Sequence, residues 1–150
     1  MKRSQLADIL TKIRNGKKRN KKEICIGTQS KMCQQILDCF VQDGWINYWY
    51  FKQNSNQNNE VYVCLKYYSK KSAFQKLKLI SKPSRKIYIS VNELGLHLNK
   101  NSKKTSLFKN QLLDNYHPFE TWVLSTSNGI LTCKNAYKKQ IGGLLLCSIY

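Results

Sequence analysis

The sequence predicts an α+β protein made of two small α/β subdomains. Apolar residues recur at helical spacing in two early segments and alternate with polar residues in several later ones, which is typical of helices packed on sheets. A polar break at residues 69–72 separates the halves, and 150 residues leave room for two such units. We therefore expect an N-terminal α-β-α-β-β subdomain at 1–70 and a C-terminal, mostly antiparallel β subdomain with a short helix at 71–150.

The first predicted helix begins after Ser4, a candidate N-cap, and stops at Gly16, a candidate C-terminal glycine. Its apolar residues fall at positions i, i+3, i+4 and i+7 and so share one side: Leu6, Ile9, Leu10 and Ile13. A run rich in lysine follows at 17–22. At the net charge of this chain, contact of this run with phosphate is favoured over a merely solvated loop.

The rest of the N-terminal half predicts a strand at 24–26, a helix from Ser30 to Gly44, and a hairpin of strands at 45–52 and 60–68. Six aromatic residues of this half could stack on bases. For most of them, a place in the helix-covered core of the sheet is favoured instead. These residues are Trp45, Tyr48, Trp49, Tyr50, Phe51 and Tyr62.

In the C-terminal half, apolar and polar residues alternate at 77–79 and 87–91, which predicts two strands separated by a turn at 81–85. Residues 92–98 predict a short helix. A polar stretch at about 95–120 is too long for an ordinary connection and indicates an exposed insertion. The final elements are a short helix at 134–140, a tight backbone turn at 142–143, and a buried strand at 144–150.

The segment 122–132, with the sequence W-V-L-S-T-S-N-G-I-L-T, predicts a β-hairpin. Asn128 and Gly129 suit the two central positions of a type I′ turn, where both residues need a positive φ. Three hydroxyl-bearing residues, Ser125, Thr126 and Ser127, would then stand at the end of a stiff strand. They either satisfy neighbouring backbone groups or are presented to a binding partner.

The charge of the chain points to a polyanionic partner. Lysine and arginine number 26 against 8 acidic residues, which gives a formal net charge of +18. Nucleic acid is favoured over a membrane surface for two reasons. No apolar run approaches the roughly 18 residues of a spanning helix, and the basic residues are spread along the chain instead of forming one amphipathic anchor.

The sequence lacks the patterns of an enzyme. His97 and His117 have no nearby nucleophile elbow or carboxylate pattern, so ordinary surface histidines are favoured. Phosphate-binding glycine loops and metal-ligand motifs are also missing, and we expect no cofactor, metal or small-molecule substrate. Buried free thiols in a reducing compartment are favoured for all six cysteines over a zinc site or disulfides. They are Cys25, Cys33, Cys39, Cys64, Cys133 and Cys147.

The C-terminal half contains the side chains that recognition of RNA requires. Lys82 and Arg85 can contact phosphate, and Tyr88 can stack. The hydroxyls at 125–127 can reach sugars and base edges, and the glycines at 142–143 allow close backbone approach. Whether these residues share one face is left open by the sequence.

Four segments then carry a family resemblance: L-A-D-I-L-T-K-I-R-N-G at 6–16, L-K-L-I-S-K-P-S-R-K-I-Y at 77–88, W-V-L-S-T-S-N-G-I-L-T at 122–132, and I-G-G at 141–143. With them, the chain closely resembles the bacterial-type small-subunit ribosomal protein eight family. The resemblance implies two α/β subdomains and a non-enzymatic role. It also implies binding to the central domain of small-subunit ribosomal RNA, beside neighbouring ribosomal proteins, in support of subunit assembly and translation.

Carried over by position, the resemblance adds the first helix as a second RNA contact. The full set of candidate RNA-binding residues is Lys2, Arg3, Thr11, Arg14, Asn15, Lys82, Pro83, Arg85, Tyr88, Ser125, Thr126, Ser127, Asn128, Gly129, Gly142 and Gly143.

The chain departs from the family at four places. Ser84 stands where a glycine commonly follows the proline, Leu144 where a glutamate follows the double glycine, and Cys133 where an aspartate begins a helix. The insertion at about 95–120 is much longer than the family's connection. We expect it to contact a ribosomal protein or RNA specific to an organelle.

Heavy use of Asn, Lys, Tyr and Ile indicates an A+T-rich gene, and no secretory signal or Arg-rich transit peptide pattern precedes the first helix. These features favour a mitochondrial ribosomal protein encoded in the organelle, with a plastid or bacterial cytoplasm as the alternative. The alternative function is a regulatory RNA-binding protein that represses a messenger RNA resembling the ribosomal site. A remote third reading is an enzyme dependent on cysteine or histidine.

Overall fold

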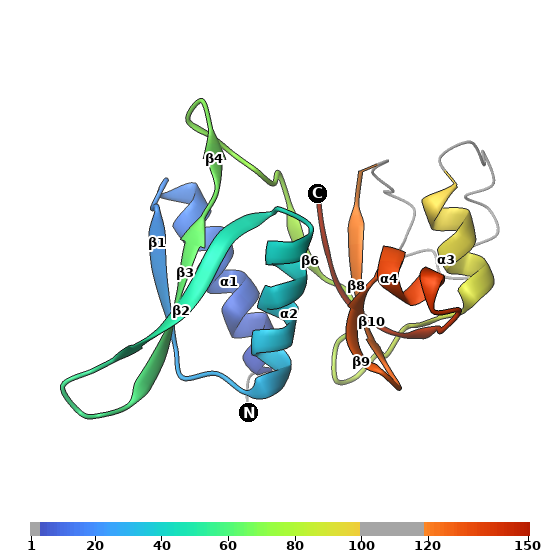
Figure 1. Ribbon diagram of the computed structural model, residues 1–150, viewed down its shortest axis with the longest axis horizontal. Coiled ribbons are helices and arrows are strands. Elements are labelled where there is room, and N and C mark those ends of the chain that lie inside the picture. Colours follow the sequence, from blue (N-terminus) through green and yellow to red (C-terminus); the bar gives the residue numbers. More distant parts are fainter. Residues whose placement is uncertain (1–3, 100–118) are drawn as a thin grey trace. The chain divides into compact units, whose positions relative to one another are not determined.

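The computed structural model describes residues 4–99 and 119–150. The candidates Lys2 and Arg3, the histidine His117, and most of the expected insertion at 95–120 lie outside these residues. The chain divides into two compact units between Leu79 and Ile80 (Figure 1). The predicted α+β class is confirmed, with an N-terminal α-β-α-β-β region and an antiparallel C-terminal sheet.

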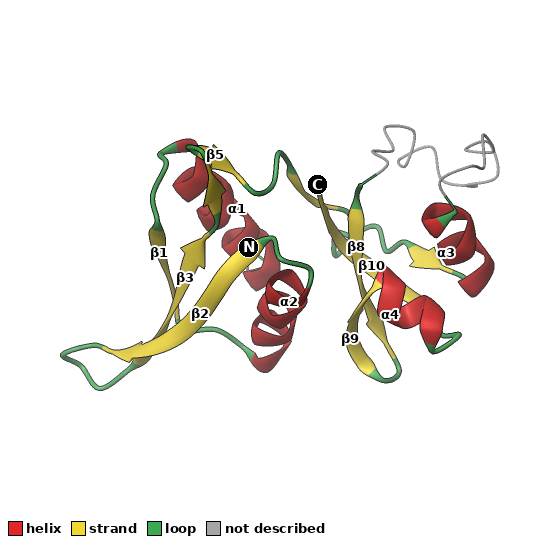
Figure 2. Cartoon of the chain, turned by 45° about the horizontal axis from the view of Figure 1, so that its top comes forward, coloured by secondary structure: helices red, strands yellow, loops and turns green. Residues whose placement is uncertain are grey.

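The first unit contains a three-stranded antiparallel sheet in the order β1-β3-β2. Its main elements are α1 (Gln5–Lys18), β1 (Glu23–Gly27), α2 (Lys31–Gln42), β2 (Ile46–Gln53) and β3 (Asn59–Leu65). Alternate residues of β1 and β3 are buried, as expected for a sheet with one covered side. Figure 2 shows both helices on the same side of this sheet.

The sequence predicted that the first helix ends at Gly16, and this prediction is wrong. The helix continues to Lys18, and Asn20 adopts the left-handed conformation just beyond it, with φ 51°. Gly16 is buried where α1 packs on β1. A Cβ atom at this position would meet the Cδ1 of Ile24 at 1.9 Å. The glycine therefore permits close helix–strand packing, whereas Gly44 does follow α2 with a positive φ of 77°.

The polar break at 69–72 is not a linker. It belongs to a short hairpin of β4 (Tyr67–Tyr68) and β5 (Lys71–Ser72), in which Ser69 and Lys70 both have a positive φ. The strand β6 (Leu77–Leu79) follows at the end of the first unit.

The six aromatic residues singled out in the sequence are not core residues, which corrects the prediction. None is fully buried, and Tyr48 and Phe51 are exposed. The core of the first unit is mostly aliphatic instead, with Phe40 and Phe74 as its buried aromatic residues. It includes Ile9, Leu10, Ile13, Ile26, Ile36, Leu37, Val61 and Val63.

The second unit is built on a sheet in which β10 lies beside β8, β8 pairs with β9, and β7 pairs with β10. Its elements are β7 (Tyr88–Ile89), α3 (Val91–Leu98), β8 (Thr121–Thr126), β9 (Gly129–Thr132), α4 (Cys133–Lys138) and β10 (Gly143–Ile149). The described part of this unit thus contains two helices, α3 and α4, whereas the predicted fold class named one short helix. Its core gathers around Trp122, Leu124, Leu94, Ala136 and Leu145.

His97 is a core residue and not the surface histidine that was predicted. Only 4% of it is exposed, and its ring stacks on that of Trp122 with the centroids 3.6 Å apart. Its Nε2 lies 2.9 Å from the backbone oxygen of Glu120. Burial lowers the pKa of His97 to about 4, against the opposing effect of this hydrogen bond.

The cysteines are free thiols, but they are not all buried. Cys25 is exposed and Cys64 is half-buried, because both point away from the helices on alternate strand positions; the other four are buried. Within residues 4–99 and 119–150, no cluster of three or more His, Cys, Asp or Glu residues could hold a metal ion. No helix in the same ranges is long and apolar enough to cross a membrane.

Candidate nucleic-acid interface

The predicted hairpin at 122–132 forms, but with a different turn. Thr126 pairs with Gly129, so Ser127 and Asn128 are the two loop residues. Only Gly129 has a positive φ, at 94°, and a Cβ atom there would meet nothing within 4 Å. The prediction of a type I′ turn centred on Asn128 and Gly129 is therefore wrong. One left-handed glycine at the end of the turn is sufficient to reverse the chain.

The three hydroxyls of this hairpin have different roles. Thr126 Oγ1 donates to the backbone oxygen of Gly129 at 2.8 Å and accepts from the backbone N–H of Asn128 at 3.2 Å, so it holds the turn together. Ser127 is exposed at the tip and Ser125 is half-buried at the end of β8. Thr126 therefore satisfies neighbouring backbone groups, while Ser125 and Ser127 remain candidates for RNA contact.

The glycine pair at 142–143 does not form a turn. Gln140, with φ 55°, reverses the chain after α4, and Gly143 is already the first residue of β10. A Cβ on Gly143 would lie 2.3 Å from the backbone oxygen of Ser125, and one on Gly142 would lie 2.5 Å from that of Ile89. Because neither backbone oxygen can move without breaking its strand, only glycine fits at both positions.

The segment 81–85 forms a tight turn that exposes its basic residues. Lys82 and Arg85 exchange two backbone hydrogen bonds of 3.0 Å, and Pro83 and Ser84 make the tip. Ser84 lacks a positive φ, so this turn does not need the glycine common in the family. The Ser81 hydroxyl accepts from the backbone N–H of Ile87 at 3.1 Å and ties the turn to the chain that leads into β7.

The structure brings several predicted residues of the second unit onto adjoining strands. Tyr88 of β7, which is 64% exposed, lies opposite Leu144 of β10, and Gly143 of β10 lies against Ser125 of β8. The backbone N–H of Ile80, just before the turn at 81–85, donates to the backbone oxygen of Leu146 of β10 at 3.0 Å. The glycines therefore hold β7, β10 and the hairpin close together.

The first helix presents a second group of candidates. Thr11, Arg14 and Asn15 are all exposed. The Thr11 hydroxyl donates to the backbone oxygen of Ala7 at 2.7 Å, and Arg14 Nε donates to that of Leu10 at 3.2 Å. Arg14 Nη2 also donates to the Thr11 hydroxyl at 3.5 Å, so the guanidinium is partly held in place by its own helix.

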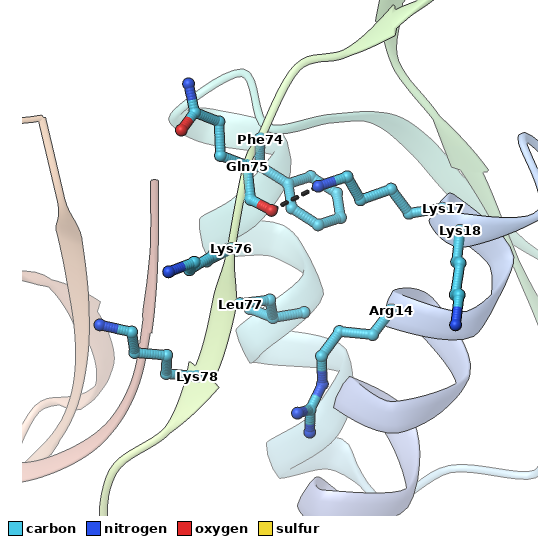
Figure 3. Close-up of a pocket in the computed structure, with 8 residues that line it drawn as sticks. All are labelled: Arg14, Lys17, Lys18, Phe74, Gln75, Lys76, Leu77 and Lys78. Carbon is cyan, nitrogen blue, oxygen red and sulfur yellow. Dashed lines mark hydrogen bonds between the residues drawn. The ribbon is translucent and has the colours of Figure 1, made fainter.

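A groove beside α1 was missed by the sequence reasoning. It has a volume of about 470 Å³ and runs between α1 and the segment 74–78 (Figure 3). Lys17 crosses it, donates to the backbone oxygen of Gln75, and lies 5.2 Å from the ring centroid of Phe74. Burial lowers the pKa of Lys17. Arg14 and Lys18 line the helix side. The contact between α1 and a segment 58 residues away has no local sequence signal.

No acidic side chain lines this groove. Its lining residues are Arg14, Lys17, Lys18, Phe74, Gln75, Lys76, Leu77 and Lys78. Figure 3 shows Leu77 directed toward α1, while Lys76 and Lys78 point away from the helix on the other side of the strand. The cations on the helix side of the groove are therefore those of α1, because the alternation of side chains along a strand directs Lys76 and Lys78 away from the helix.

Comparison with known proteins identifies the family of the chain. The family model described as Ribosomal protein S8 matches residues 4–102 and 97–150. The small ribosomal subunit protein uS8 of Ruthia magnifica subsp. Calyptogena magnifica is 30% identical over 145 residues, which cover 97% of this chain and 95% of that protein. The uS8 proteins of Rhizobium etli (strain CIAT 652) and Sinorhizobium fredii are 28% and 29% identical, each over 97% of this chain and 96% of the relative. The chain is thus a member of the ribosomal protein S8 family, whose role is structural and not enzymatic.

Proposed function

We propose that this protein binds the central domain of small-subunit ribosomal RNA and holds it in place during subunit assembly and translation. The observation that carries the proposal is the close approach of Gly143 to Ser125, which joins the hairpin, β10 and β7 in one small region. The net charge of +18 supports RNA as the partner, because it favours a polyanion.

In the second unit, each proposed contact follows from the chemistry of its side chain. Lys82 and Arg85 meet phosphates, and the exposed ring of Tyr88 stacks on a base or sugar. The hydroxyls of Ser125 and Ser127 can donate and accept, which suits ribose 2′-hydroxyls and base edges. We assign Thr126, Gly129, Gly142 and Gly143 to shaping this surface through their contacts within the protein.

In the first unit, we propose that Arg14, Lys18 and Asn15 contact a second stretch of RNA backbone along α1. The groove beside them has a cationic side and no carboxylate, which suits phosphate. The partners of the protein within the subunit are thus ribosomal RNA and neighbouring ribosomal proteins.

Binding can be tested with the full chain and a transcript of the central domain of small-subunit ribosomal RNA. We expect hydroxyl-radical footprints at two separate places on the transcript, one for each unit. Ser127→Ala should remove protection at one place and Arg14→Gln at the other. Equal affinity for the transcript and for a shuffled RNA of the same length would refute the proposal.

We further propose that the protein works in a mitochondrial ribosome and is encoded in the organelle. Its bacterial-type relatives and the A+T-rich codon usage implied by its composition support this location. Mass spectrometry of ribosomes purified from isolated mitochondria of the source cells tests it. We expect the chain in the small subunit there, and its recovery only from plastid or cytoplasmic ribosomes would contradict the location.

A further inference from the structure

The two helices of the first unit, α1 and α2, both lie on one side of its sheet, and among the described residues of this unit no helix lies on the other side (Figure 2). The strand residues that point to this side form what we call the tyrosine face: Tyr48, Tyr50, Tyr62, Glu23, Glu60 and Lys52. The residues between them on β1 and β3 point to the helices and are buried. Two thiols, Cys25 and Cys64, also lie on the tyrosine face.

The three tyrosine rings form a continuous array. Tyr50 lies opposite Tyr62 across β2 and β3, and their rings stack at 5.6 Å with an angle of 19°. Tyr48 follows on β2, with its ring centroid 6.2 Å from that of Tyr50, and 56% of it is exposed. Tyrosine presents a large, rigid contact area at low cost in side-chain entropy, and it is enriched at the centres of protein interfaces.

The charge of this surface is opposite to that of the chain. The tyrosine face carries one lysine and two glutamates on a protein with a net charge of +18. Tyr50 donates its hydroxyl to Glu23, and this hydrogen bond is the main reason why the pKa of Tyr50 is raised to about 12. The thiol of Cys25 donates to Glu60 at 3.4 Å. The ring array is therefore neutral at physiological pH and is flanked by carboxylates.

One cation–π contact lies within the tyrosine face itself. Lys52 Nζ lies 5.6 Å from the ring centroid of Tyr62, which is within the range of a cation–π interaction. Within residues 4–99 and 119–150, neither Glu23 nor Glu60 forms an ion pair. Their carboxylates are thus available to a cation brought by a partner.

From this geometry we propose that the tyrosine face is a docking surface for a basic segment of another protein. Arginine or lysine side chains of the segment stack on the tyrosine rings, while Glu23 and Glu60 accept their hydrogen bonds. The tyrosine face shares no residue with the groups assigned to RNA. Phosphate would be repelled by both carboxylates, whereas the α1 groove and the basic turn at 81–85 contain no acid.

The net charge of the chain makes the test selective, because a cationic peptide is repelled by most of its surface. Fluorescence anisotropy of a labelled nona-arginine peptide would be measured with the full-length protein at low salt. We expect Glu23→Gln/Glu60→Gln and Tyr48→Ser/Tyr62→Ser each to weaken binding by about tenfold. The control Asp8→Asn/Glu120→Gln removes two carboxylates elsewhere and should weaken it much less.

Lys52→Glu adds a carboxylate to the tyrosine face and should strengthen peptide binding several-fold, a gain that misfolding cannot produce. The proposal is overturned if the peptide does not bind, or if the control lowers the affinity as much as the change at Glu23 and Glu60. It is also overturned if labelled oligouridine binds more tightly than the peptide and loses affinity in Tyr48→Ser/Tyr62→Ser. In that case the face would stack on bases.

Discussion

The α-carbon of Gly143 lies so close to the backbone of Ser125 that a Cβ atom would come within 2.3 Å of its carbonyl oxygen. This contact joins the last strand to the strand that carries the hydroxyl cluster. A backbone oxygen paired in a sheet cannot move aside as a side chain can, so any larger residue at position 143 must separate the two strands.

Gly143→Ala should therefore lower the free energy of unfolding by about 1 to 3 kcal/mol, the usual cost of overpacking. It should also weaken RNA binding by moving Ser125. Urea unfolding followed by tryptophan fluorescence, together with filter binding, measures both effects. Gln35→Ala is the control, because Gln35 is exposed on α2 of the first unit and is not among the residues assigned to RNA. An equally large loss in the control would argue against strand separation as the cause.

Ser127→Ala should weaken binding of cognate RNA by roughly 1 to 3 kcal/mol, the usual cost of leaving a polar partner unsatisfied. Its exposed hydroxyl has no assigned role in the turn, so the free energy of unfolding should not change. Thr126→Val should show the opposite pattern, a loss of stability of about 1 kcal/mol, because Thr126 holds the turn. Isothermal titration with cognate and shuffled RNA separates the two roles. If Ser127→Ala weakens both RNAs equally, the contact is not specific.

The α1 cations should determine part of the salt dependence. Arg14→Gln/Lys18→Gln should reduce the slope of log affinity against log salt by about one for each phosphate that the protein no longer neutralises. Lys70→Gln/Lys71→Gln in the β4–β5 hairpin removes the same charge outside the groove and is the matched control. Titrations at several salt concentrations give the slopes. Equal slopes for the two double variants would show that only net charge matters.

Acid should destabilise the second unit through His97. Its pKa is about 4 in the folded protein and near 6.5 when unfolded, so the unfolded chain binds more protons between these values. The stabilisation is fully present above pH 6.5 and is lost as the pH falls toward 4. Each unit of difference between the two pKa values corresponds to about 1.36 kcal/mol, so the loss in the free energy of unfolding approaches roughly 3 kcal/mol. Urea unfolding at several pH values measures it. His97→Phe should flatten the profile in this window, and an unchanged profile would exclude His97 as the cause.

Several features of the first unit could be predicted because they depend on neighbours in sequence. The spacing of Ile9, Leu10 and Ile13 is sufficient to place the buried side of α1, and Gly44 ends α2 as expected. Gly16 was misread, because a glycine near a helix end has the same local pattern whether it stops the helix or admits a strand. Only the 1.9 Å approach of its would-be Cβ to Ile24 distinguishes the two.

In the candidate site, too, some features could be predicted from neighbours in sequence and others depend on contacts between distant residues. The S-T-S-N-G segment was enough to predict a hairpin, and the resemblance to the family indicated RNA. The separate roles of Thr126 and Ser127 depend on the register, in which Thr126 pairs with Gly129. The groove beside α1 could not be predicted, because Lys17 and Gln75 meet only after the chain has returned across the first unit.

By itself, the sequence determined the helices, most strands, the polyanion-binding charge and the family, since these follow from local periodicity, composition and motifs. The tertiary structure alone decided which glycines allow close backbone approach, that His97 is buried against Trp122, and that Tyr48, Tyr50 and Tyr62 lie on the side of the sheet opposite to α1 and α2. Burial depends on which residues distant in sequence pack together, and an aromatic or histidine side chain has the same local pattern on either side of a sheet.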